Sequence, residues 1–207
     1  MAYTCHDGSF RCLMDEISKL REEIEQAAMV VRGGGVILYP TDTVWGIGCD
    51  ATNPKAVERV YSIKRRADHK AMIVLLDSVD AIEKYADGVP EVAYDLIRYS
   101  ERPLTIVYDH GVGLAPGLLG PDGSIGIRVT GEKFSKGLCR HLRRPLVSTS
   151  ANISGKPAAR CFADISDDII KAVDHVVDWR RDEPAGTRRP SSVIRLTESG
   201  VIDILRP

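Results

Sequence analysis

The sequence contains no long apolar run. Its longest apolar stretches, GGGVILYP and KAMIVLLD, are far shorter than the roughly 20 residues that a membrane helix requires. The first residues also lack the apolar centre of a signal peptide. We therefore expect a protein without a membrane partner, located in the cytoplasm.

Paired cysteines are absent as well. The five cysteines are odd in number, and none belongs to a CxxC pair or to a Cys/His spacing that suits zinc, so we expect free thiols. A large excess of either charge is also missing, because 28% of the residues are charged and yet the formal net charge is −1. Any anion site must therefore be local, since the chain as a whole does not attract polyanions.

The common motifs for nucleotide binding and serine hydrolysis do not occur. Neither GxxxxGK[ST] nor GxGxxG is present, and the glycines at 33–35 precede a strand instead of opening a helix. A GxSxG nucleophile motif is missing too, which argues against a serine hydrolase. If the protein binds a nucleotide, side chains must hold the phosphates, and Lys64, Arg66 and Arg128 carry the charge for this.

Predicted helices and strands alternate along most of the chain. Apolar residues three or four apart predict a helix over 17–31, and Asn53 with Pro54 marks the start of another. A further helix is predicted over 167–179. Strands are expected at VILYP, AMIVLL, PLTIVYD, SIGIRVT and PLVSTS, with a closing hairpin of VIRL and VIDILR. This order predicts an α/β fold with a twisted mixed sheet flanked by helices.

The chain length fits one domain. We expect residues 1–13 to form a leader that could be disordered, and residues 14–207 to form a single domain. The loop RRDEPAGTRRPSS is a candidate lid, because it combines glycine, proline and charge.

The segment STSANISG ends the last of the five main strands and is rich in hydroxyl groups. Since side chains alternate along a strand, Ser148, Ser150 and Asn152 are predicted to point the same way and to meet one ligand. The alternative is that they form a turn and cap the next element, which is common for these residue types.

Lys64 and Arg66 follow the predicted helix that starts at Asn53. Residues two apart do not share a helix face, so both can serve one ligand only if the helix ends near Ile63. The alternative is a solvated basic helix end that complements the helix dipole.

Taken together, the segments YPTDTVWGIG, KxR, PLT, GIRV and STSANISG resemble the YrdC-like (TsaC-like) family of threonylcarbamoyl-AMP synthases. This resemblance implies a concave, positively charged cleft and a condensation of ATP, L-threonine and bicarbonate to threonylcarbamoyl-AMP with release of pyrophosphate. The product would pass to a tRNA threonylcarbamoyltransferase complex that modifies adenosine 37 of tRNA. Mg²⁺, carried with ATP, is the implied cofactor.

The resemblance also assigns roles to individual residues. The KxR and SxN signatures imply a catalytic set of Lys64, Arg66, Ser150 and Asn152. For ATP it implies Lys64, Arg66 and Ser150 together with Thr105, Arg128 and Ser148, and for threonine it implies Thr41, Arg128 and Ser150. Asp42 is a conceivable metal ligand, although loop capping is the ordinary role of such a residue. The chain departs from the family pattern at Ala67, Ala71 and Thr130, where relatives often carry proline.

An RNA-binding or ribosome-assembly module is the alternative from another functional class. Basic residues cluster at 64–70, 140–144 and 180–189, and such clusters attract phosphate backbones, so weak RNA binding is possible. Aromatic residues make up only 6% of the chain and do not interleave with the cations, which argues against this alternative.

Overall fold

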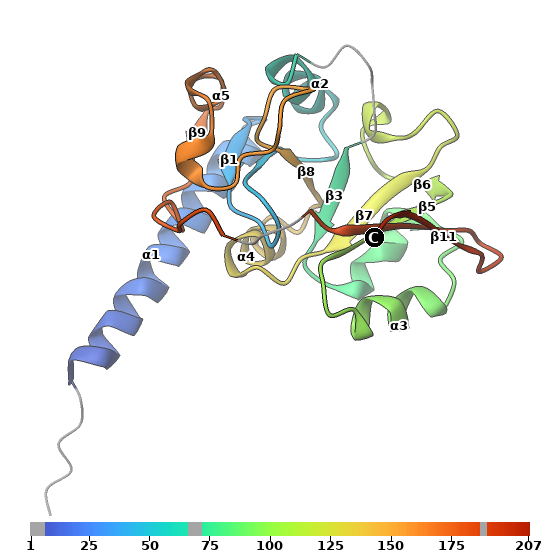
Figure 1. The fold of residues 1–207 in the computed structure, drawn as a ribbon, viewed down its shortest axis with the longest axis horizontal. Helices are drawn as coiled ribbons and strands as arrows, with labels where there is room; N and C mark the ends of the chain where they lie inside the picture. Colours follow the sequence, from blue (N-terminus) through green and yellow to red (C-terminus); the bar gives the residue numbers. More distant parts are fainter. Residues whose placement is uncertain (1–6, 66–71, 187–189) are drawn as a thin grey trace, which may run out of the picture.

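A computed structural model describes residues 7–65, 72–186 and 190–207. Nine strands form one mixed sheet in the order β11-β10-β5-β7-β3-β8-β2-β1-β9 (Figure 1). The prediction of an α/β fold with a mixed sheet is therefore confirmed. The strands of this sheet are β1 (Ile37–Tyr39), β2 (Gly46–Gly48), β3 (Ile73–Leu76), β5 (Leu104–Tyr108), β7 (Ile125–Val129), β8 (Leu146–Ser150), β9 (His175–Val176), β10 (Ser192–Leu196) and β11 (Ile202–Arg206).

Helices and short turns connect these strands. The α-helices are α1 (Asp7–Arg32), α2 (Pro54–Ile63), α3 (Val92–Tyr99), α4 (Lys133–Leu142) and α5 (Asp167–Ala172). The 3₁₀ segments are η1 (Val79–Lys84), η2 (Pro116–Leu118) and η3 (Phe162–Asp164), and β4 (Ala86–Asp87) pairs with β6 (His110–Gly111) in a separate small sheet.

Local sequence explains the start of α2, and the backbone at Arg65 explains its end. The Asn53 side chain accepts hydrogen bonds from the backbone N–H groups of Lys55 and Ala56, and Pro54 occupies the first turn, where its missing N–H costs nothing. The helix ends at Ile63, as a shared ligand for Lys64 and Arg66 requires, because Arg65 adopts a left-handed conformation with φ of 50°.

Two apolar cores cover the two faces of the sheet. On β3, Val74 belongs to the core beneath α2, whereas Leu75 belongs to the core beneath α1 and α4. This alternation is the direct consequence of the two-residue period of a strand. Burying one such side chain stabilises the folded state by about 1.5–3 kcal/mol. Because both faces of the sheet bury such side chains, both cores stabilise it.

Three elements differ from the prediction. The helix predicted over 167–179 ends at Ala172, and the next residues form β9, which pairs in parallel with β1. The pattern alone could not show this, since the apolar run in that segment suits a short strand and a helix equally. Strand β2 was not predicted, because its core is Gly-Ile-Gly. Helix α1 begins at Asp7, within the residues expected to form a leader.

Two further predictions concern cysteines and membranes. Cys49, Cys139 and Cys161 are free thiols, as expected, and the first two are buried. Across the described ranges, no helix is both long and apolar enough to cross a bilayer.

Candidate active site

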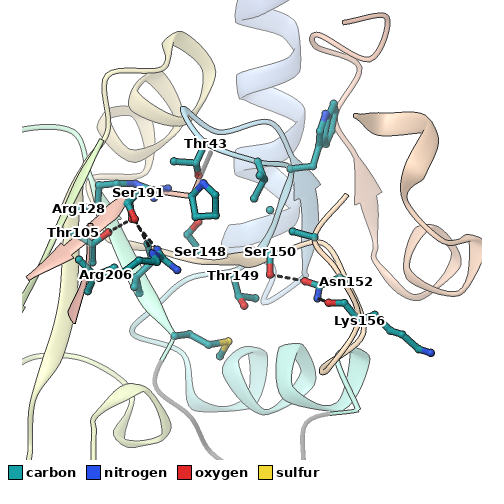
Figure 2. Close-up of a pocket in the computed structure, with 18 residues that line it drawn as sticks. Thr43, Thr105, Arg128, Ser148, Thr149, Ser150, Asn152, Lys156, Ser191 and Arg206 are labelled. Atoms are coloured by element: carbon teal, nitrogen blue, oxygen red, sulfur yellow. Dashed lines mark hydrogen bonds between the residues drawn. The ribbon is translucent and has the colours of Figure 1, made fainter. Parts of the chain in front are cut away.

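A cavity of about 390 Å³ lies on one face of the sheet (Figure 2). Because Ile106, Ile127 and Val147 belong to the core beneath α2, their neighbours along the strands point to the opposite face. The lining is Thr43, Val44, Trp45, Gly46, Met72, Ile73, Thr105, Arg128, Ser148, Thr149, Ser150, Asn152, Lys156, Ala158, Pro190, Ser191, Val193 and Arg206.

Five of the residues predicted from the sequence line this cavity: Thr105, Arg128, Ser148, Ser150 and Asn152. They come from three strands that are separated in sequence, and the fold brings them to one place. The alternation predicted along the end of β8 is only partly realised, since Thr149 also lines the cavity. Thr105 and Arg128 lie within strands, so the site covers the face of the sheet as well as a strand exit.

Arg128 is the buried charge of the site. Its side chain is 3% exposed, and its Nη2 lies 3.1 Å from Oδ1 of Asp42. Burial lowers the pKa of the Arg128 guanidinium and raises the pKa of the Asp42 carboxyl, and in each case the partner's charge opposes the effect of burial. The Nε of Arg128 is buried and has no hydrogen-bond partner in the described part of the chain. The Arg128 residue lines the cavity, and a guanidinium in such a position is suited to an anionic ligand.

A cluster of hydroxyl groups and a second cation lie close to Arg128 in Figure 2. The hydroxyls of Thr105 and Ser191 are 2.8 Å apart. Arg206 donates from Nε to the carbonyl oxygen of Ser191 at 2.9 Å and from Nη2 to its hydroxyl at 3.3 Å. The contact between Thr105 and Ser191 exists because β10 pairs in parallel with β5, with Ser192 opposite Leu104.

The SxN segment makes the other side of the cavity. The Ser150 hydroxyl donates to Oδ1 of Asn152 at 2.5 Å, and Nδ2 of Asn152 donates to the carbonyl oxygen of Lys156 at 2.5 Å. The turn interpretation of this segment is therefore confirmed, and the same residues line the cavity, while their contact with one ligand stays a prediction.

Lys64 holds the backbone of this segment by hydrogen bonds. Its side chain is buried, and its Nζ donates to the carbonyl oxygens of Ser150 at 2.6 Å and Asn152 at 2.8 Å. The predicted convergence of Lys64 with Ser150 and Asn152 is thus observed. Lys64 does not belong to the cavity lining, so in this structure it acts on the site through the backbone of that segment. Arg66 lies outside the described residues.

Thr41, predicted to contact threonine, lines a smaller pocket that shares Thr43, Val44 and Trp45 with the first cavity. It is buried, donates from Oγ1 to the carbonyl oxygen of Val44 at 2.7 Å and accepts from the backbone N–H of Thr43 at 3.0 Å. These bonds fold the PTDT turn, and Thr43, not Thr41, lines the large cavity. The hydroxyl-rich turn was recognised from the sequence, but which of its two threonines faces the cavity depends on the backbone path.

Several lining residues were not predicted, among them Thr43, Lys156, Ser191 and Arg206. No local pattern distinguishes Ser191 or Arg206 from ordinary strand-end residues, because their role depends on pairing with distant strands. The candidate lid, residues 180–192, contributes Pro190 and Ser191 to the lining, whereas 187–189 lie outside the described residues. At its start, Arg180 forms ion pairs with Glu132 at 3.2 Å and Glu183 at 2.7 Å.

The donors at the site do not form a metal-binding set. No group of three His, Cys, Asp or Glu side chains that could hold a metal ion occurs among the residues described. Asp42, the conceivable ligand, is engaged by Arg128 instead. The residues around the cavity thus offer hydroxyls, an amide and cations, which are groups that bind phosphate oxygens.

These features define the class of protein: an α/β domain with a polar cavity, lined by Arg128 and Arg206, on one face of its sheet. The chain belongs to the Sua5/YciO/YrdC family, whose model, described as "Telomere recombination", matches residues 29–207. The resemblance noted in the sequence is confirmed.

Curated relatives match nearly the whole chain. A threonylcarbamoyl-AMP synthase of Stutzerimonas stutzeri is 38% identical over 185 residues, which cover 89% of this chain and 96% of the relative. A threonylcarbamoyl-AMP synthase of Pseudomonas aeruginosa is 36% identical over 182 residues, which cover 87% of this chain and 95% of the relative.

Solved structures show the same fold. Sua5 of P. abyssi, complexed with L-threonine, matches with a TM-score of 0.72 and 28% identity, covering 84% of this chain and 50% of that chain. A P. abyssi Sua5 variant matches with a TM-score of 0.79 and 29% identity, and the present chain spans 56% of its length. YciO of E. coli matches with a TM-score of 0.73 and 27% identity, covering 88% of this chain and 87% of that chain.

Proposed function

We propose that this protein is a threonylcarbamoyl-AMP synthase, which condenses L-threonine, bicarbonate and ATP to threonylcarbamoyl-AMP and pyrophosphate. The observation that carries this proposal is the buried Arg128, which lines a cavity together with hydroxyls and an amide. Relatives that bear this name match the chain over nearly their whole length, which supports the assignment.

The reaction is chemically suited to this site. The threonine amine combines with bicarbonate to give a carbamate and water. A carbamate oxygen then attacks the α-phosphorus of ATP, and the bond from that phosphorus to the bridging oxygen breaks as pyrophosphate leaves with the electron pair. Such transfers depend mainly on positioning and on stabilising negative charge, and little covalent help from the protein is needed.

The two sides of the cavity suit two different parts of the substrates, the phosphates of ATP and the group that attacks them. Arg128 and Arg206, with the hydroxyls of Thr105 and Ser191, offer forked donors and charge for the phosphates. The Ser150–Asn152 segment, held by the ammonium group of Lys64, would orient the substrate beside them. Its rigidity matters because a misplacement of about 1 Å can cost a hundredfold in rate.

The remaining elements of the proposal concern cofactor, location and partner. We propose that Mg²⁺ enters bound to the phosphates of ATP and to water, since the described donors do not form a metal set. The reaction would take place in the cytoplasm, and the adenylate would pass to a tRNA threonylcarbamoyltransferase complex.

Mass spectrometry of a complete reaction tests the proposal. Purified protein incubated with ATP, L-threonine and bicarbonate should produce threonylcarbamoyl-AMP and an equal amount of pyrophosphate. Omission of threonine should abolish both products. Pyrophosphate release without the adenylate, or no turnover at all, would contradict the assignment.

A further inference from the structure

A second cavity, of about 290 Å³, lies at the opposite end of β3 from the first. Ile73 lines the first cavity and Leu76 lines the second, so the strand separates them by roughly 10 Å at about 3.3 Å per residue. The lining of the second cavity is Leu76, Asp77, Ser78, Asp80, Ala81, Lys84, Tyr85, Arg140, Arg143 and Arg144. Nothing in the proposed reaction uses these residues.

Positive charge predominates in this cavity, since four cationic and two acidic residues line it. Arg140 has only a long contact to Asp77, 3.7 Å from Nε to Oδ2. Lys84 and Arg143 are exposed, and in the described parts of the chain neither has an ion-pair partner within 4.0 Å. Two cationic groups are therefore available to an incoming anion.

Arg144 is held in place by an ion pair with a buried carboxylate. Its Nη1 lies 2.5 Å from Oδ2 of the buried Asp50. The other carboxylate oxygen of Asp50 accepts hydrogen bonds from the backbone N–H and the hydroxyl of Thr52. A guanidinium that is already oriented loses less conformational freedom when it binds, which favours recognition of a ligand at this position.

The backbone at Arg143 is unusual. Arg143 ends α4 in the left-handed conformation, with φ of 54°, where glycine is the favoured residue. A side chain with a β-carbon is strained in this conformation, so an arginine here sacrifices stability. Strained residues gather at sites where the side chain is needed for another purpose, and this one lines the cavity.

We propose that this second cavity binds a phosphate group, supplied either by free pyrophosphate or a nucleotide or by the backbone of an RNA. Guanidinium groups match phosphate oxygens in pairs, and a terminal phosphate carries about −1.5 to −2 charges, which suits the excess of positive charge. The excess of cationic over acidic residues in the lining favours an anion over a cation as the ligand.

Hydrogen exchange of the full-length protein tests the proposal directly. With inorganic pyrophosphate added, peptides spanning 77–85 and 139–145 should exchange more slowly, and this protection is read separately from that of peptides 146–154 at the first cavity. The same measurement with a short RNA duplex distinguishes the source. Protection by pyrophosphate indicates a free phosphate ligand, and protection by RNA alone indicates the backbone.

The double variant Lys84→Gln with Arg143→Gly isolates the site. Glycine is favoured at positive φ, so this variant should fold at least as well as the wild type. The concentration needed for protection of 77–85 and 139–145 should rise about tenfold or more, because two charged hydrogen-bond donors are lost. The control is the double variant Lys55→Gln with Arg98→Gln, which removes two exposed charges elsewhere. It should leave the concentration needed for protection unchanged.

Two results would overturn the proposal. One is the absence of protection of both peptides with either ligand, and the other is unchanged protection in the double variant. Adenylate synthesis is measured separately, and the double variant should retain it. If the wild type does not synthesise the adenylate, the proposed function is contradicted, whereas the proposal of a phosphate site in the second cavity is not affected.

Discussion

Replacement of Lys64 by methionine is the sharpest test of how the site is built. The ammonium group donates to the carbonyl oxygens of Ser150 at 2.6 Å and Asn152 at 2.8 Å, and the residue is 3% exposed. A charged hydrogen bond contributes about 1.5–3 kcal/mol, and an unsatisfied buried acceptor costs about 1–3 kcal/mol. Part of this loss is recovered because a buried charge is removed.

We therefore expect Lys64→Met to destabilise the Ser150–Asn152 segment by about 2–4 kcal/mol. Hydrogen exchange in 150–154 should accelerate by roughly 30-fold or more, since opening of the segment becomes easier by that free energy. Adenylate formation should fall by about ten- to a hundredfold, because the hydroxyl and amide of the segment are no longer held in place. Both quantities can be measured on the same preparation.

Lys55→Met is the matched control, since Lys55 is exposed on the same helix. It should leave both exchange and turnover at wild-type values. If Lys64→Met loses activity while 150–154 exchanges at the wild-type rate, the reasoning is refuted, and Lys64 acts on the substrate directly.

Three further predictions concern other parts of the molecule. Asp42→Asn should lower the melting temperature by roughly 6–12 °C, because it removes the counter-ion of the buried Arg128 at a cost of about 3 kcal/mol. Asp122, whose pKa is lowered to about 2 chiefly by a hydrogen bond from the Ser124 hydroxyl, should stabilise the fold above about pH 4 and lose this effect as the pH falls towards 2. Gly48→Ala should destabilise the protein by about 1–3 kcal/mol, since its β-carbon would lie 2.3 Å from the carbonyl oxygen of Val147.

Simple comparisons check each of these. Pyrophosphate should restore part of the stability of Asp42→Asn, and an unchanged melting temperature would show that Arg128 needs no counter-ion. Asp122→Asn should melt below the wild type at neutral pH and together with it near pH 2; a constant difference across this range would contradict the pKa argument. Gly131→Ala is the control for Gly48→Ala, because nothing lies within 4 Å of its added β-carbon.

Features governed by neighbouring residues could be predicted from the sequence. The start of α2 follows from the cap at Asn53 and from Pro54, and its observed end at Ile63 agrees with the argument from Lys64 and Arg66. The closing hairpin, β10 with β11, was predicted because strand patterns flank a short turn. The residues at 148–152 were recognised because their hydroxyls and amide follow an apolar strand.

Features that depend on contacts between distant residues could not be predicted from the sequence. The segment after Ala172 becomes β9 because β1 offers it an edge to pair with, and its own residues do not specify a strand. Thr43 lines the first cavity together with Thr105 and Ser148, which come from distant parts of the chain.

The sequence by itself determined where α2 begins and which hydroxyl-rich segment lines the cavity. Only the tertiary structure decided that Ser191 meets Thr105 and that Lys64 holds the backbone of Ser150. The physical reason is range: caps, turns and alternation act over a few residues of the chain, whereas strand pairing and side-chain burial join residues 86 positions apart and depend on the packing of the whole sheet.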